Sequence, residues 1–71
     1  MTAYRVAMPD GTVATMTGQP GMTLAVVGMV KGGWSVFAGF SHFGPASDEV
    51  DYLTASFNLS QVQVVPTFPS V

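Results

Sequence analysis

The residues of this chain that could do chemistry are few, and most of them lie within one short stretch. Asp48, Glu49 and Asp51 form the only acidic cluster, and His42 is the only histidine. Carboxylates can bind a divalent cation or exchange protons, and an imidazole can act as a general base. Side chains at positions i, i+1 and i+3 of a helix do not converge well on one ion. We therefore interpret the acidic cluster as the first turn of a helix, where its charge favours the helix dipole.

The sequence gives His42 no catalytic partner. The chain contains no cysteine, and none of its serines lies in a Gly-x-Ser-x-Gly turn. Ser41 would point the opposite way from His42 on a strand. We expect His42 at the surface or at a strand end, and we expect no catalytic residue, no cofactor and no metal site.

The glycines do not form a recognisable phosphate-binding loop. Gly18-x-x-Gly21 and Gly28-x-x-x-Gly32-Gly33 lack the lysine–serine ending of a Walker loop and the strand–turn–helix setting of a dinucleotide site. Turns and close packing explain them better. Gly28 and Gly39 fall inside expected strands, where glycine marks a bulge or the close approach of another group.

The chain carries very little charge. Charged residues make up 8% of its 71 residues, against roughly 25% in an ordinary soluble domain. The surface must therefore be covered by uncharged polar groups or by another chain, which favours a homo-oligomer or a protein partner. Arg5 and Lys31 are the only two cations, too few to neutralise a run of phosphates, so we expect no nucleic-acid partner and no binding to an anionic membrane.

The length predicts a single domain over residues 1–71 with a small core. Residues 22–40 are apolar enough to suggest a membrane span, but Lys31-Gly32-Gly33 interrupts them at the centre. A lysine at mid-bilayer costs about 2.5–3.5 kcal/mol on insertion scales. Two strands joined by a turn fit this segment better.

The pattern predicts an α+β fold in which a small antiparallel sheet of about five strands carries one helix on one face. Pro9-Asp10-Gly11 is the strongest local signal, and it predicts a hairpin with Met8 opposite Thr12. The order is β-β-β-β-α-β, with strands at residues 4–8, 12–17, 23–30, 34–41 and 61–65 and a helix at residues 48–57.

Three finer expectations follow from the same pattern. Ser47 is a preferred helix N-cap, and Asn58 is a suitable stop. Strict alternation places Trp34, Val36, Ala38 and Phe40 on one face of their strand and Phe37 on the other. The final strand ends at Pro66 and Pro69, so we expect residues 61–65 at an edge of the sheet, free to pair with a second chain.

Eight aromatic residues are more than a core of this size is expected to need. Some of them would then form an exposed apolar patch, and such patches mark interfaces. Phe37, Phe40 and Phe43 are the interface candidates. The alternative is that all the aromatic residues pack into one core.

The opening residues 4–15, YRVAMPDGTVAT, followed by the strand Ala25-Val26-Val27, resemble small orphan proteins encoded by actinobacterial phages. The resemblance covers about a third of the chain. The turn at residues 16–22 departs from it in having no basic residue. It implies a phage or mobile-element origin, and it implies no activity and no functional residue.

Taken together, these features predict a small non-enzymatic accessory protein that acts through protein–protein contact, with a host protein as its partner. A structural, self-assembling oligomer of a virion or assembly is the alternative, and a small enzyme is a third possibility. Met1 to Arg5 are not followed by an apolar segment, so we expect no secretory signal. The expected location is the cytoplasm of the host cell.

Overall fold

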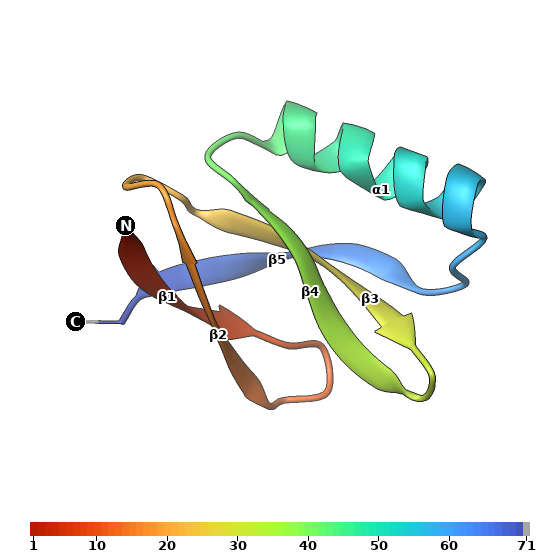
Figure 1. The fold of residues 1–71 in the computed structure, drawn as a ribbon, viewed down its shortest axis with the longest axis horizontal. Coiled ribbons are helices and arrows are strands. Elements are labelled where there is room, and N and C mark those ends of the chain that lie inside the picture. The colour runs from red at the N-terminus through yellow and green to blue at the C-terminus, as the bar shows by residue number, and fades with distance from the viewer. Residues whose placement is uncertain (71) are drawn as a thin grey trace.

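A computed structural model describes residues 1–70 as five strands and one helix (Figure 1). The expected element order and the α+β class are confirmed, and every strand pair is antiparallel. The elements are β1 (Thr2–Ala7), β2 (Val13–Gly18), β3 (Leu24–Val30), β4 (Gly33–Phe40), α1 (Phe43–Phe57) and β5 (Val62–Pro69).

The strands lie in the order β2-β1-β5-β3-β4, which places the last strand at the centre of the sheet. The expectation that residues 61–65 form an edge is therefore wrong. β5 pairs with β3 over Val62 to Pro66 and with β1 over Thr67 to Pro69, so it joins the two hairpins. The free edges of the sheet belong instead to β2 and β4.

The prolines of β5 do not end the strand, because each lies where the ladder needs no N–H group. The amide of Thr67 donates to the carbonyl of Thr23 at 2.9 Å. Since the bonding direction alternates along an antiparallel strand, odd-numbered residues face β3 and even-numbered residues face β1. Pro66 faces β1, but it lies one residue beyond the last β1–β5 pair, which is Val6 with Thr67. Pro69 faces the side of β3, but it lies beyond the first residue of β3, so no strand among residues 1–70 is there to accept a hydrogen bond.

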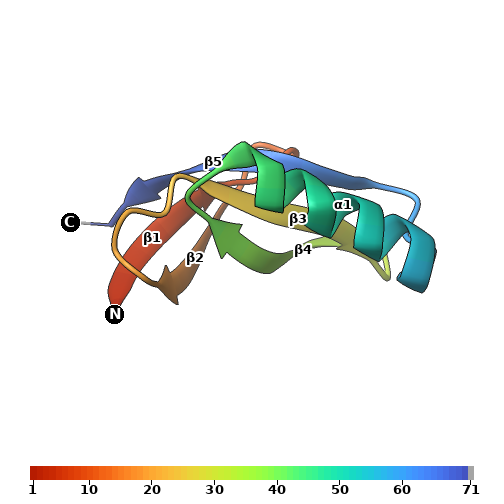
Figure 2. The same ribbon diagram turned by 90° about the horizontal axis from the view of Figure 1, so that it is seen from above.

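The sheet has a core on each face. Val26 and Val27 are neighbours in β3, both are fully buried, and they point into different cores. This strand is therefore covered on both faces. Figure 2 shows α1 along one face, where Ala46 and Leu53 of the helix pack in one core with Val26. The other core, on the concave face, contains Val6, Met8, Ala25, Val27 and Val65.

The concave core has no helix over it, and the sheet curls to close it. Gly18 at the end of β2 and Gly39 in β4 both lie against the buried side chain of Met22, where a Cβ at either position would collide with it. The buried Tyr4 hydroxyl fixes the same corner, since it donates to the carbonyl of Gln19 at 2.6 Å and accepts from the amide of Met22 at 3.2 Å. Gly39 thus marks a point where the side chain of Met22 comes close to the backbone of β4, as the position of this glycine inside a strand predicts.

The first hairpin has the expected register. The amide of Met8 donates to the carbonyl of Thr12 at 3.0 Å, and Gly11 has a φ of 89°. The carboxylate of Asp10 accepts from both the hydroxyl and the amide of Thr12. Both bonds lower the pKa of Asp10 from its ordinary value of 3.8, and the bond from the Thr12 hydroxyl has the larger effect.

The helix begins five residues earlier than expected, at Phe43, so Ser47 is not its N-cap. His42 occupies that position without a side-chain capping bond. Pro45 did not stop the helix because it lies in the first turn, where an amide has no helical partner to lose. The end is as expected, with Asn58 in the left-handed conformation.

Replacing Gly11 with valine should lower the free energy of unfolding by about 1 kcal/mol or more, because a β-branched residue resists a positive φ. Gly44→Ala is the matched control, since Gly44 lies in α1 with open space around it and a negative φ. Urea denaturation should show this variant unchanged or slightly more stable. Equal stability of Gly11→Val and the parent would remove this turn as a determinant of the register.

Candidate functional site

The structure places the polar candidates on or beside α1 without gathering them into a site. His42 is exposed before the first turn, and Asp48 and Asp51 are exposed along the helix, with Glu49 half-buried. The first turn contains no acidic residue, so the dipole explanation of the cluster is wrong. Among residues 1–70, no three histidine, cysteine, aspartate or glutamate side chains are close enough to hold a metal ion.

The three aromatic interface candidates have three different environments. Phe43 is 64% exposed at the start of α1, and Phe37 is 40% exposed on β4. Phe40 is only partly exposed, because it packs against the core beneath the helix. The structure therefore leaves Phe43 and Phe37 available to a partner and makes Phe40 largely a core residue.

A bulge in β4 decides where Phe37 points. Val26 pairs with Ala38 and Val27 pairs with Val36, so Phe37 is the extra residue with no partner on β3. Strict alternation is thereby broken, and the expected single face from Trp34 to Phe40 is wrong. Trp34 and Val36 pack on the concave core, whereas Phe40 packs beneath the helix.

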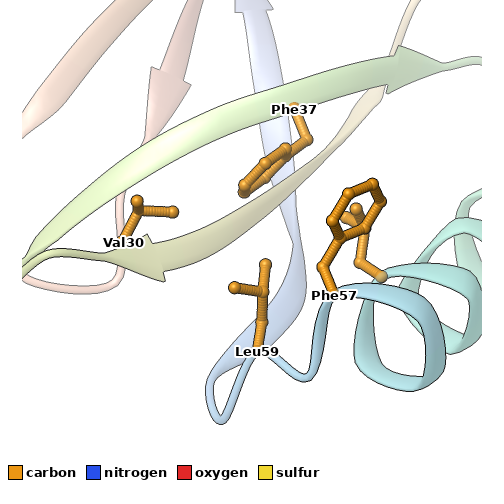
Figure 3. A pocket seen from close by; sticks show the side chains of 5 residues that line it. Val30, Phe37, Phe57 and Leu59 are labelled. Atoms are coloured by element: carbon orange, nitrogen blue, oxygen red, sulfur yellow. The ribbon is translucent and has the colours of Figure 1, made fainter.

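Phe37 lines an apolar groove between the end of α1 and the β3–β4 hairpin. Figure 3 shows its ring facing Phe57 and Leu59 across the groove, with Val30 farther along β3. The groove has a volume of about 330 Å³. All its lining residues are apolar: Val30, Phe37, Leu53, Phe57 and Leu59.

Gly28 forms part of the floor beneath Phe37. A Cβ at this position would lie 2.8 Å from Cε2 of Phe37 and 3.4 Å from Cδ1 of Leu59. The missing side chain of Gly28 leaves room for the ring to lie close to β3 at the bulge. On the helix side, Phe57 is 60% exposed and packs edge-on against Tyr52, with ring centroids 5.7 Å apart.

Sequence reasoning missed most of this groove. The helical spacing of Leu53 and Phe57 indicates a buried face, but only Leu53 is buried, and Phe57, the last residue of α1, stays exposed. The available signal was Phe57-Asn58-Leu59, two large apolar residues on either side of a helix stop. Residues in that position lie at the rim of a core, where they are only half covered.

A second, smaller hollow lies at the opposite end of the sheet. It has a volume of about 190 Å³ and is lined by Arg5, Ala7, Val13 and Phe68. It contains one charged side chain and lies on the β1–β2 hairpin and β5, away from α1.

Comparison of the chain with protein-family models, with curated proteins and with solved structures finds no match. Within residues 1–70 there is no helix with the length and apolar character needed to cross a membrane.

Substitution by glutamate should distinguish the buried aromatic candidate, Phe40, from the exposed one, Phe43. Phe40→Glu places a carboxylate against the core beneath α1 and should lower the free energy of unfolding by about 2 kcal/mol or more. Phe43→Glu should change it by less than about 0.5 kcal/mol, because its ring is mostly in water. Thermal melts of both variants test this, and equal losses would contradict the different burial of the two rings.

Proposed function

We propose that this chain is a small non-enzymatic accessory protein that acts by holding another protein at the groove between α1 and the β3–β4 hairpin. The apolar groove is the observation that supports this most strongly. A charged or strongly polar group entering it would lose hydration without gaining a side-chain partner. A large apolar side chain suits it, and such anchors dominate binding energy at protein interfaces.

The charge of α1 adds a second property of the partner. The helix forms one wall of the groove and carries three of the four acidic residues of the chain, Asp48, Glu49 and Asp51. A partner surface with lysine or arginine around its apolar anchor would be attracted to this wall. The resemblance of the first third of the chain to phage proteins makes a host protein in the bacterial cytoplasm the proposed partner.

The function test uses the full chain as bait in lysate of an actinobacterial host, followed by titration with the purified captured protein. Phe57→Lys should weaken binding at least tenfold, or about 1.4 kcal/mol, because it places a charge in the groove while suiting the end of the helix dipole. Phe68→Lys makes the same change at an exposed phenylalanine outside the groove and should bind like the parent. Affinity should also fall with added salt.

The same titration separates the competing functions. Equal binding by Phe57→Lys and the parent, with both folded, would place the interface elsewhere. His42→Ala and Asp48→Ala should keep the biological activity, and its loss in either variant with fold and binding unchanged would make the protein an enzyme. Capture of no host protein, together with assembly of the chain into particles larger than a dimer, would favour the alternative, a structural self-assembling oligomer.

A further inference from the structure

We propose that two copies of this chain pair through their β2 strands, antiparallel and about a two-fold axis at Thr15, to make one continuous sheet. This inference concerns a different surface from the groove and does not depend on it. Within residues 1–70, β2 pairs with β1 on one side and has no strand paired to its other side.

The β2 edge lacks the features that normally keep sheet edges apart. Natural edge strands carry lysine, proline or a bulge, or they are very short. Val13–Gly18 contains no charge and no proline, and its six pairs with β1 run without a shift. The other edge, β4, is interrupted by the bulge at Phe37 and begins with glycine. The two edges therefore differ, and β2 is the one suited to pairing.

The backbone groups that would pair can be identified by residue. The amide of Met8 donates to the carbonyl of Thr12, so even-numbered residues of this strand face β1. Val13, Thr15 and Thr17 then direct their N–H and C=O groups outward. In an antiparallel partner centred on Thr15, the two copies of Thr15 pair with each other and Val13 pairs with the partner's Thr17. All the outward groups of these three residues then find partners.

The side chains of this edge permit the arrangement. Val13, Thr15 and Thr17 are exposed and uncharged, so no like charges oppose one another across the axis. Arg5, which pairs with Thr15, lies one strand inward. Its distance from the partner's Arg5 is about three strand spacings, or roughly 14 Å, which exceeds the screening length of about 8 Å in physiological salt. Gly18 at the end of β2 lies against the side chain of Met22, and the proposed register uses only Val13 to Thr17.

Sedimentation equilibrium of the full chain tests this proposal. The parent should have twice its 7.4 kDa chain mass at high micromolar concentration. Thr15→Pro removes an outward N–H that the fold does not use, and Thr15→Lys places two cations at the axis. Both should sediment at the chain mass with unchanged circular dichroism. Ser35→Lys is the matched control on the β4 edge and should remain dimeric.

A charge-reversal experiment completes the test. Thr15→Glu mixed with Thr15→Lys should form a dimer of both chains, since opposite charges then meet at the axis. A monomeric parent would overturn the proposal. Dissociation by Ser35→Lys with Thr15→Pro still dimeric would overturn it too, as would a folded Thr15→Lys variant that sediments like the parent.

Discussion

The last strand, β5, is hydrogen bonded to both hairpins, and both cores depend on where it lies. Its first half pairs with β3 and its second half with β1, and the partner changes at Pro66. Val65 contributes to the concave core, while Val62 and Val64 pack on the core beneath α1. Without this strand no sheet hydrogen bonds would connect β1 and β2 with β3 and β4.

The two surfaces proposed for binding follow from this central position. Because the chain must return from α1 to the middle of the sheet, Phe57 at the end of the helix and Leu59 in the connection to β5 are left around the groove. Because β5 occupies the centre, β2 is left at an edge with uncharged residues facing outward. The low charge of the sequence is thus reflected in two surfaces, an apolar groove and an uncharged edge, each suited to a protein surface.

The sequence predicted the features that are encoded locally. The Pro9-Asp10-Gly11 turn, the two hairpins and the helix stop at Asn58 each depend on a few adjacent residues, and all are confirmed. The central place of β5 depends on pairs more than sixty residues apart, such as Val6 with Thr67, and no local pattern contains them. The groove was missed because it brings together residues of β3, β4 and the end of α1, and because Phe37 reaches it only through the bulge in β4.

The most direct test of the central role of β5 is native-state amide hydrogen exchange. The amides of Gln63, Val65 and Thr67 face β3, and those of Tyr4 and Val6 face β2. We expect all five amides to exchange only through global unfolding, with free energies equal within about 0.5 kcal/mol, because the first hairpin does not persist once β5 leaves. Faster exchange in β5 than at Tyr4 and Val6 would show that the first hairpin is stable alone and would contradict the central role of β5.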